Sequence, residues 1–475
     1  MMEHRTANGL KPVNHENLEV FAGKLRGKLI LPQNEDYDAA RAVWNGMIDR
    51  YPAMIAQCAD EQDVIQAVRF AREQGLIVSV RGGGHNVAGH ATNDGGIVID
   101  LGPMKRVQLN LEGQTVHVQG GATWADVDAV TQQHGFAVPG GVVSETGVAG
   151  LTLGGGFGHL RNKYGLSSDN LVGAEVVTAD ARLLHASLDE NADLFWGLRG
   201  AGGNFGIVTT FEFRLRPLDP SVYFLAVFHH GSRAKEGLRL FRDYSRNAPD
   251  EVSVVAFCTT VPPHLEFYPS KYHGDPALVF VGCYAGDPEE GERVMQPLRA
   301  LGDPVADFSG VIPYVEAQTF FDEDYPSGEL RYYWKSLNLA RFDDDVIDRI
   351  VGHALKQPSP LNTVDIWYNG GAIRRFPESE SAFHGRNVEF VLSPEANWKD
   401  AADDEANIAW LRNMLADMEE FSDGSRYLNF PGFNEEGEAT MRATFGEKYD
   451  KLVALKTKYD PDNLFRLNQN ITPSG

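Results

Sequence analysis

Residues 80–86 read Val80-Arg-Gly-Gly-Gly-His-Asn86, and they follow an apolar run, residues 76–80, that is typical of a buried strand. The three glycines allow the backbone to turn sharply and to come close to a ligand before His85 is presented. Backbone N–H groups beside an imidazole suit a phosphorylated cofactor. The same heptapeptide also fits a glycine-rich turn with a packed histidine, so other features have to decide between the two interpretations.

Two further glycine-rich segments favour the ligand-binding interpretation. Residues 147–158 read Gly147-Val-Ala-Gly-Leu-Thr-Leu-Gly-Gly-Gly-Phe-Gly158. We expect this segment to be a poor helix or strand, because each glycine costs backbone entropy, and a bound dinucleotide would hold it in place. Residues 193–206 predict a short helix that runs into a third glycine-rich turn. Each turn lies beside a predicted strand, which chance does not readily explain.

The segments around these turns predict a β-α-β opening. Asp60 is a suitable N-cap for a helix with apolar residues at helical spacing, and Gly75 is expected to end that helix. Strands are expected at residues 76–80 and 97–101. The other elements expected here are a first helix at 36–44, a strand at 116–119, a helix at 123–133 with a Thr123 cap, Asp126 three residues on and Gly135 after its end, and strands at 171–178 and 207–215.

The sequence changes character after Pro217. Strand-like runs alternate with one clear helix, residues 289–300, which indicates an α+β lobe built on an antiparallel sheet. The expected strands are 223–229, 252–258, 277–284, 329–339, 362–369 and 387–392, and helices are expected at 403–420 and 439–459.

Composition limits the class of protein. The chain has 475 residues, more than one hydrophobic core usually holds, and a formal net charge of −23, which disfavours nucleic acid and anionic membranes as partners. Cys58, Cys258 and Cys283 are far apart, so neither a disulfide framework nor a metal site is expected. We found no signal-peptide core and no apolar run of membrane-spanning length. We therefore expect a cytoplasmic protein with a small-molecule substrate; the oligomeric state is left open.

Several nucleotide and hydrolase motifs are missing from the chain. No Gly-x-Gly-x-x-Gly occurs, and the turn at Gly200-Ala-Gly202 departs from that pattern at Phe205. A Walker A sequence, a His-Glu-x-x-His motif and a Gly-x-Ser-x-Gly elbow are also absent. These absences disfavour a nicotinamide-dependent reductase, a nucleotide hydrolase, a zinc protease and a serine hydrolase. A flavin cofactor remains compatible with the sequence.

Six segments carry a family signature. They are residues 81–86 (Arg-Gly-Gly-Gly-His-Asn), 146–156 (Thr-Gly-Val-Ala-Gly-Leu-Thr-Leu-Gly-Gly-Gly), 163–170 (Lys-Tyr-Gly-Leu-Ser-Ser-Asp-Asn), 198–208 (Leu-Arg-Gly-Ala-Gly-Gly-Asn-Phe-Gly-Ile-Val), 427–430 (Tyr-Leu-Asn-Phe) and 459–471. With these segments the chain resembles the vanillyl-alcohol oxidase superfamily, which has a PCMH-type FAD-binding domain. Within it, the chain is most similar to the berberine-bridge-enzyme-like branch and its bacterial hydroxynicotine-oxidase-like members, over nearly the full length.

The resemblance implies an α+β fold in two parts. A PCMH-type FAD-binding domain would comprise residues 40–217, completed by a berberine-bridge-enzyme-like C-terminal segment, residues 425–475. A substrate domain, residues 218–424, would be inserted between them and built on an antiparallel sheet flanked by helices.

The resemblance also implies how FAD is held. His85 occupies the family's position for a covalent bond from imidazole to the flavin 8α-methyl group, which would raise the flavin potential and fix its position. Val143 stands where many relatives add a second link through cysteine, so we expect a single link; the alternative is a His85 that only hydrogen-bonds FAD. The residues implied at the cofactor are Arg81, Gly82, Gly83, Gly84, His85, Asn86, Thr146, Gly147, Gly150, Leu151, Thr152, Gly155, Gly156, Asn170, Gly206, Ile207, Val208, Asn468 and Asn470.

The catalytic base is less well defined. Relatives often use the second tyrosine of a Tyr-x-Asn-Tyr motif, but residues 427–430 here read Tyr-Leu-Asn-Phe, so that phenol is missing. Tyr427 and Asp365 are the catalytic candidates, although Tyr427 also fits a core residue and Asp365 a sheet-edge charge. Strand alternation puts Asp365 on one face with Trp367 and Asn369, which is compatible with an active-site wall.

Four other polar residues have possible roles at the substrate. His384 and Glu389 are weaker candidates for the base and fit solvated surface residues better. Lys335 and Arg386 would orient an anionic or carbonyl group of the substrate, or would form surface salt bridges. An amine oxidised as the free base needs no strong base, which fits the missing phenol. The sequence leaves alcohols, sugars and amines open as substrates.

We therefore expect an FAD-dependent oxidoreductase that transfers a hydride from a small alcohol, sugar or amine C–H to flavin N5. Thr146 falls where relatives place a residue beside the oxygen-reactive edge of the flavin. Its modest side chain favours O2 as the electron acceptor, with H2O2 as the product. The alternatives are a dehydrogenase with another acceptor and a flavin-binding protein without efficient turnover.

Overall fold

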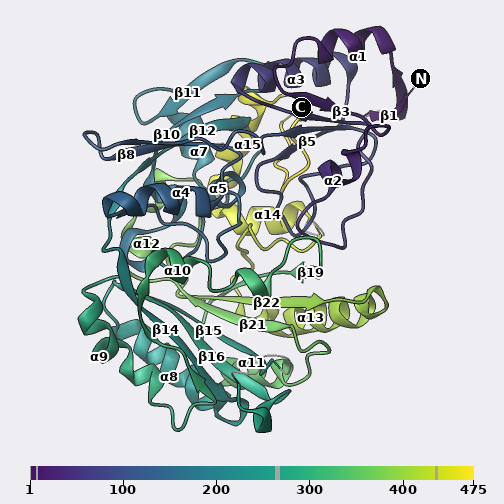
Figure 1. Ribbon diagram of the computed structural model, residues 1–475. Coiled ribbons are helices and arrows are strands. Elements are labelled where there is room, and N and C mark those ends of the chain that lie inside the picture. Colours follow the sequence, from purple (N-terminus) through teal and green to yellow (C-terminus); the bar gives the residue numbers. More distant parts are fainter. Residues whose placement is uncertain (1, 7–8, 263–267, 434–436, 475) are drawn as a thin grey trace.

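The N-terminal part of the chain folds as the predicted β-α-β unit (Figure 1). The computed structural model describes residues 2–6, 9–262, 268–433 and 437–474. Both strands that flank the first long helix pair in parallel with the same neighbour, and the resulting first sheet has the order β3-β4-β6-β5. These elements are β3 (Lys28–Ile30), β4 (Met54–Gln57), α3 (Glu61–Gln74), β5 (Val78–Arg81) and β6 (Ile97–Asp100).

The predicted helix caps are confirmed. The Asp60 carboxylate accepts the N–H groups of the second and third residues of α3, and Gly75 ends the helix in the left-handed region with φ 64°. At α4 (Trp124–Thr131), Thr123 and Asp126 form a reciprocal capping box. Local hydrogen bonding thus fixes where both helices begin.

The helix predicted at 36–44 is shorter than expected and is not the first helix. A hairpin of β1 (Met2–Thr6) and β2 (Gly9–Val13) and then α1 (His15–Ala22) precede it. The observed helix, α2 (Tyr37–Arg41), ends where residue 42 adopts extended backbone angles, φ −62° and ψ 146°. This early end frees Trp44 from the helix, and its side chain is only 2% exposed.

A second sheet, with the order β11-β10-β12-β8-β7, carries the third glycine-rich turn. Its strands are β7 (Val107–Asn110), β8 (Thr115–Gln119), β10 (Leu171–Val177), β11 (Leu183–Ser187) and β12 (Ile207–Arg214). The C-terminal α15 (Tyr449–Tyr459), yellow in Figure 1, returns to pack on α7 (Ala192–Leu198) beside this sheet. The single helix predicted at 439–459 is broken at Gly446, with φ 53°, so that α14 (Glu438–Phe445) precedes α15.

The antiparallel sheet predicted after Pro217 is confirmed, and we call it the lobe sheet. Its order is β17-β14-β16-β15-β21-β22-β19, and β18 and β20 pair beside this path. Its strands are β14 (Ser221–His230), β15 (Val252–Thr260), β16 (Pro276–Tyr284), β17 (Ala306–Asp307), β18 (Gly310–Pro313), β19 (Arg331–Trp334), β20 (Leu337–Leu339), β21 (Thr363–Tyr368) and β22 (Phe390–Trp398).

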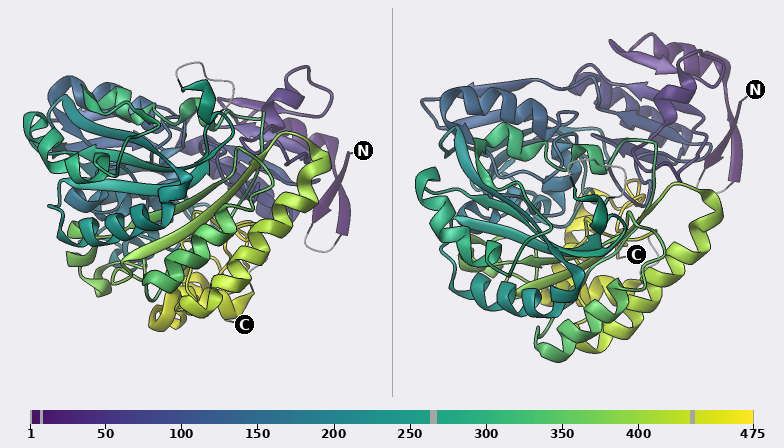
Figure 2. Two further views of the ribbon diagram at one scale, coloured as in Figure 1. Left: turned by 90° about the horizontal axis from the view of Figure 1, so that it is seen from below. Right: turned by 60° about the horizontal axis from the view of Figure 1, so that its bottom comes forward.

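Helices cover one face of the lobe sheet, as Figure 2 shows, and two of them were not predicted. They are α8 (Ala234–Asn247), α9 (Pro288–Arg299), α11 (Asp344–Ala354) and α13 (Asp404–Met418). Only α9 and α13 follow the expected positions. The α8 sequence is mostly charged or polar, but its apolar residues, which include Leu238 and Phe241, form a clear stripe at helical spacing, so this helix was recoverable from the sequence.

Both faces of the lobe sheet are buried, and they differ in what they contact. Along β15, Val254 and Ala256 belong to the core beneath the helices, whereas Val255 and Phe257 belong to a separate core with Phe157 from the second glycine-rich segment. The second face therefore looks toward the flanking N-terminal half. The lobe strands lie between residues 221 and 398, while the boundaries predicted at 217/218 and 424/425 remain predictions.

The strand predicted at 387–392 is longer and contains a proline. In β22, Pro394 is paired with Val364 of β21 on one side. On its other side the neighbouring chain is interrupted between β19 and β20, at residues 335 and 336. Proline cannot donate a ladder hydrogen bond, so it is tolerated opposite this interruption. The strand therefore continues to Trp398 and carries Glu395 into the sheet.

Two ion pairs, each with at least one buried side chain, connect the lobe to the flanking parts of the chain. Arg386 contacts Asp169 at 2.6 Å, with side-chain exposures of 1% and 3%, and Lys448 contacts Glu378 at 2.8 Å. Arg386 is thus a structural ion-pair partner. Across the residues with assigned placement, we found no helix that is long and apolar enough to cross a membrane.

Candidate active site

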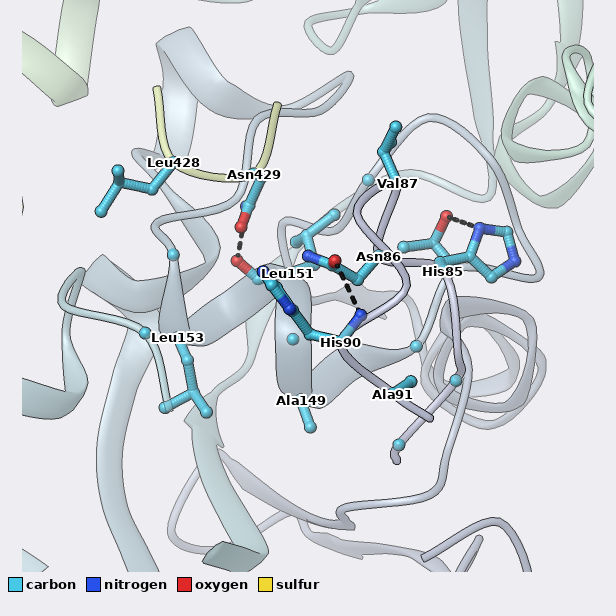
Figure 3. Close-up of a pocket in the computed structure, with 18 of the residues that line it drawn as sticks. His85, Asn86, Val87, His90, Ala91, Ala149, Leu151, Leu153, Leu428 and Asn429 are labelled. Atoms are coloured by element: carbon cyan, nitrogen blue, oxygen red, sulfur yellow. Dashed lines mark hydrogen bonds between the residues drawn. The ribbon is translucent and has the colours of Figure 1, made fainter. Parts of the chain in front are cut away.

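One cavity joins the three glycine-rich turns to the lobe sheet. Its volume is about 310 Å³. Walls come from the first turn, from the second segment at 146–154, from residues between 202 and 208, and from the C-terminal residues 465–469. Figure 3 shows His85 and His90 around the same space as Leu428 and Asn429, although these pairs are far apart in the sequence. The fold therefore converges on the motifs singled out from the sequence.

The first two glycine-rich turns touch backbone to backbone. A Cβ atom on Gly83 would lie 2.5 Å from the N and Cα atoms of Gly147, and a Cβ on Gly147 would lie 2.4 Å from the Gly83 nitrogen. Because backbone atoms cannot move aside, both positions require glycine. This close approach places the N–H-rich first turn at the entry to the second segment.

The second segment is partly helical, which corrects the expectation that it is a poor helix. Residues Val148–Leu153 form α5, and only Gly155 and Gly156 after it adopt positive φ angles, 115° and 95°. Glycine in a helix costs about 1 kcal/mol relative to alanine. Burial of Val148 and Leu153 in the core of the second sheet offsets this cost.

Replacing Gly147 with alanine is expected to lower the free energy of unfolding by about 3 kcal/mol, because the overpacking is against backbone. The matched control is Gly352→Ala in α11, where an added Cβ meets no atom within 4 Å. There alanine should stabilise the helix by up to about 1 kcal/mol. Denaturant titration of both variants measures the difference, and equal stability of Gly147→Ala and the unmodified protein would contradict the contact.

His85 is held between an aromatic side chain and a hydroxyl group. Trp44 stacks on the imidazole with ring centroids 5.1 Å apart and an interplanar angle of 16°, and Tyr332 stacks on the other face of Trp44 at 3.8 Å. The Thr146 hydroxyl lies 3.5 Å from His85 Nδ1, as Figure 3 shows by a dashed line. Burial lowers the pKa of His85 to about 4, so the imidazole is neutral.

The structure brings most of the predicted cofactor residues to the cavity. Those that line it are Gly82, Gly83, Gly84, His85, Asn86, Thr146, Gly147, Gly150, Leu151, Gly206, Ile207, Val208 and Asn468, and the catalytic candidates Tyr427 and Asp365 line it as well.

Six predicted cofactor residues lie outside the cavity wall, namely Arg81, Thr152, Gly155, Gly156, Asn170 and Asn470. Arg81 instead forms a buried ion pair with Asp100 at 2.7 Å. The Asn170 amide donates to the carbonyl oxygens of residues 164 and 166 and accepts from Arg216. Arg81 and Asn170 therefore hold the loops in place, and their direct contact with a cofactor is not supported by these positions.

One face of the lobe sheet forms the opposite wall. Asp365 and Trp367 from β21 line the cavity with Val255 and Phe257 from β15, which are their register partners. Asp365 and Trp367, which strand alternation places on one face, both line this cavity. Asn369 does not line the cavity, because β21 ends at Tyr368 and its backbone turns to pair with Glu389.

Glu395 lies beside Asp365 on this wall. Asp365 pairs with Ser393, and Glu395 is two residues further along β22, so both carboxyl groups project from the same face. Burial raises the pKa of Asp365 to about 7. Burial and the charge of Asp365 raise the pKa of Glu395 well above its ordinary value. Two such neighbours do not both ionise readily, so the pair retains a proton near neutral pH.

Tyr427 is buried against the second glycine-rich segment. Its phenol oxygen accepts N–H groups from Gly156 and Phe157, each at 3.1 Å, and from the Asn429 amide at 2.9 Å. The ring stacks on Phe157 at 4.0 Å, and burial raises the pKa of the phenol to about 12. These contacts fix the turn and disfavour Tyr427 as a base at neutral pH, so Asp365 is the better candidate.

The weaker candidates lie elsewhere. Glu389 forms exposed ion pairs with Arg246 and Arg374, and His384 lies 3.0 Å from Glu378. None of His384, Glu389, Lys335 and Arg386 lines the cavity. The surface or structural interpretation is therefore the better one for these residues.

Sequence reasoning missed several residues of the wall. Glu395 was missed because the predicted strand ended at residue 392, and Trp44 because it was placed in a helix. His90, four residues after Asn86, was recoverable from its place in the first turn. Other missed residues with rings or amides on the wall include Phe157, Phe321, Tyr325, Trp334 and Gln469.

The cavity fits FAD. His90 Nε2, Asn468 Oδ1 and Gln469 Nε2 are buried at its wall without a hydrogen-bond partner among the placed residues, so the wall has polar atoms to offer a ligand. The glycine turns leave space for close backbone approach, and their N–H groups suit a diphosphate. The residues that would hold FAD are those of the three turns, with His85, Asn468 and Gln469.

Comparisons with known proteins agree with this site. A family model described as FAD binding domain matches residues 52–187, and one described as berberine and berberine like matches residues 426–472. (R)-6-hydroxynicotine oxidase from Paenarthrobacter nicotinovorans is 32% identical over 465 residues, covering 95% of this chain and 98% of the relative. The crystal structure of 6-hydroxy-D-nicotine oxidase from Arthrobacter nicotinovorans matches with a TM-score of 0.84 and 31% identity, covering 95% of this chain and 98% of that one.

A further match concerns the flavin linkage. A structure of glucooligosaccharide oxidase from Acremonium strictum, described with a 6-S-cysteinyl, 8α-N1-histidyl FAD, has a TM-score of 0.84. It is 24% identical and covers 97% of this chain and 100% of that one, so it shows the fold.

The fold and the cavity define an enzyme, an FAD-dependent oxidoreductase. More specifically, the chain belongs to the berberine-bridge-enzyme-like FAD-linked oxidases. The resemblance found in the sequence and the predicted α+β fold with a PCMH-type FAD-binding part are confirmed. So is the prediction of FAD as the cofactor.

Proposed function

We propose that this enzyme removes a hydride from a C–H bond of a small molecule and passes the electrons to O2, with FAD linked only through His85. The continuity of one cavity from His85 to Asp365 carries this proposal. The named relatives act on hydroxynicotine and on glucooligosaccharides, which supports a small-molecule substrate.

Two features support a single covalent link. His85 is neutral, so a ring nitrogen has a free lone pair for bond formation, and the Trp44 stack fixes the plane of its ring. Val143 lines the cavity at the position where a relative's second link would be cysteine, and its side chain has no sulfur. The fold neighbour glucooligosaccharide oxidase is described with both a histidyl and a cysteinyl bond to FAD, whereas this chain has valine at the position expected for the cysteine.

The chain's own residues supply position and proton transfer. When bound, FAD supplies the two-electron acceptor for the hydride. Asp365 would take the N–H or O–H proton of the substrate, and its raised pKa places the change of protonation near neutral pH. The apolar side chains Val255, Phe257 and Trp367 around the acid keep water away from it.

We propose O2 as the electron acceptor and the cytoplasm as the location, as the sequence led us to expect. Thr146, beside His85, has a small side chain that favours access of O2; a dehydrogenase with another acceptor is the alternative. The three cysteines are buried and free, which supports a reducing compartment such as the cytoplasm.

The test is acid precipitation of the purified protein, with His85→Ala alongside. We expect flavin absorbance to stay with the unmodified pellet, on one peptide that contains His85, and to be lost from the variant pellet. Trp44 and Thr146 remain in the variant, so its cavity keeps its other contacts. A separate mixing experiment should show that air reoxidises the reduced flavin rapidly.

Three results would contradict parts of this proposal. Release of flavin from the unmodified protein by acid would show that FAD is not covalently bound. A second flavin-bearing peptide that does not contain His85 would contradict the single link. Reduced flavin that persists in air would contradict O2 as the acceptor and favour a dehydrogenase with another acceptor.

A further inference from the structure

The charged groups on the cavity wall are of one sign. Among the described residues that line it, Asp365 and Glu395 are the only acids, and no lysine or arginine is present. The imidazoles of His85 and His90 are neutral, because burial lowers the pKa of each to about 4. Any charge that a substrate meets here is therefore negative, and an anionic substrate would find no counter-ion.

The pair can carry that charge at a defined place. Glu395 is anchored, since the Tyr325 hydroxyl donates to its Oε2 atom at 3.2 Å. Asp365 Oδ1 is buried and has no hydrogen-bond partner among the described residues. One carboxyl group retains a proton and the other ionises, so the pair presents up to one negative charge with a free acceptor atom.

Aromatic rings surround the pair. Trp334 lies opposite Glu395 in the strand register, and its ring is 5.3 Å from Tyr325 and 5.9 Å from Phe430. Trp367 stands next to Asp365 on the same strand face. Ring faces attract cations, and a carboxylate beside them adds a direct ion pair.

From this arrangement we infer that the substrate is a cationic amine, held by the Asp365–Glu395 pair inside the aromatic wall. The inference rests on the proposed oxidase function and names its substrate class. It also explains Phe430. The ring of Phe430 extends the aromatic wall beside Trp334, where a tyrosine would add a hydroxyl group.

The amine chemistry balances at this site. The ammonium group gives one N–H proton to the ionised carboxylate. The adjacent C–H bond then breaks, its hydrogen leaves as hydride to FAD, and the nitrogen lone pair forms a C=N bond. The substrate loses two electrons, and O2 takes them up with two protons as H2O2. Only the proton transfer requires a side chain of this chain.

Binding of a fixed cation tests the inference without turnover. Phenyltrimethylammonium and its neutral isostere tert-butylbenzene would be titrated into the FAD-loaded enzyme at pH 8, with the flavin absorbance as the signal. We expect the cation to bind at least about tenfold more tightly, a difference of about 1.4 kcal/mol. The double variant Asp365→Asn/Glu395→Gln, which is neutral, should lose this preference.

Glu389→Gln is the matched control, because it neutralises a carboxylate of the same lobe that does not line the cavity. It should keep the cation preference. If the double variant does not fold with flavin bound, the pH dependence in the unmodified enzyme makes the test: the cation preference should weaken as the pH falls below about 7 and Asp365 takes up a proton. Equal or tighter binding of the neutral isostere, or a preference that survives in the neutral variant, would overturn the inference.

The two hypotheses fail differently. The enzyme could prefer the cation although no amine, alcohol or sugar bleaches its flavin. That result would support the cation site and contradict the oxidase function. Bleaching by neutral alcohols or sugars without cation preference would keep the oxidase and reject the cationic substrate.

Discussion

Replacing Asp460 with asparagine is expected to lower the free energy of unfolding by about 3–5 kcal/mol, because a buried ammonium loses its counter-charge. Lys456 and Asp460 are both 0% exposed and lie 2.6 Å apart, one helical turn from each other. Lys456 Nζ also donates to the carbonyl oxygens of Asn204 and Phe465, each at 2.8 Å. Asparagine keeps one acceptor oxygen and removes the charge.

The same pair supports the cofactor site. Asp460 accepts the N–H groups of Leu464 and Phe465, and so orders the C-terminal segment that supplies residues 465–469 to the cavity wall. We therefore expect Asp460→Asn to lower the flavin content of the purified protein as well as its stability. A variant that is destabilised but retains all its flavin would contradict this second effect.

Lys458→Met is the matched control on the same helix. Lys458 pairs with Asp193 at 2.6 Å, but the two side chains are 58% and 40% exposed. Exposed pairs contribute about 0–1 kcal/mol, so this change should be nearly neutral. Denaturant unfolding of both variants gives the comparison, and similar shifts would show that burial of the Lys456–Asp460 pair does not matter.

Sequence alone predicted the elements whose signals are local. The Asp60 cap, the Thr123–Asp126 capping box and the left-handed Gly75 and Gly135 are fixed by side chains and backbone within a few residues. The first glycine-rich turn was also recoverable, because it follows a buried strand and carries a histidine. These features need no knowledge of the rest of the fold.

Features that depend on distant partners were not predicted. Glycines in α5 suggested a loop, but burial against the second sheet makes a helix there. The strand predicted at 387–392 stops short of Pro394, but an interruption in the neighbouring chain accommodates this proline within β22. Glu395 reaches the cavity only because β22 continues past that proline. The acidic pair is therefore a tertiary feature that a linear pattern does not reveal.

The sequence also did not separate residues that line a site from residues that hold its loops. Arg81 and Asn170 belong to the same motifs as His85, yet they pair with Asp100 and with backbone carbonyl groups. Such residues occur in a signature because the turn needs them. Direct contact requires the direction of each side chain, which only the structure supplies.

Asp365→Asn is expected to lower the rate constant for flavin reduction by the substrate by about 10²–10⁴-fold, the usual contribution of a positioned base. Stopped-flow reduction without oxygen measures it, with an amine that bleaches the unmodified enzyme. The control Glu389→Gln lies outside the cavity and should be unchanged. Equal rates in Asp365→Asn and the unmodified enzyme would exclude Asp365 as the base.

The pH dependence of stability gives an independent check on Asp365. Its pKa is raised by burial from 3.8 to about 7, so between these values the folded state keeps a proton that the unfolded state has lost. The contribution of Asp365 to stability is therefore fully present below about pH 4 and is lost as the pH rises through about 7. Glu395 and Tyr325 lie on the same cavity wall as this carboxyl group, and burial raises the pKa of each well above its ordinary value.

Asparagine cannot titrate, so Asp365→Asn should lose part of this decline in unfolding free energy between pH 4 and 7. In the unmodified enzyme the reduction rate should move the opposite way and rise toward pH 7 and above, since only the ionised carboxylate accepts a proton. Ionisation of this one carboxyl group should therefore lower the free energy of unfolding and raise the rate of flavin reduction. A rate that rises with pH in Asp365→Asn as it does in the unmodified enzyme would assign the base to another residue.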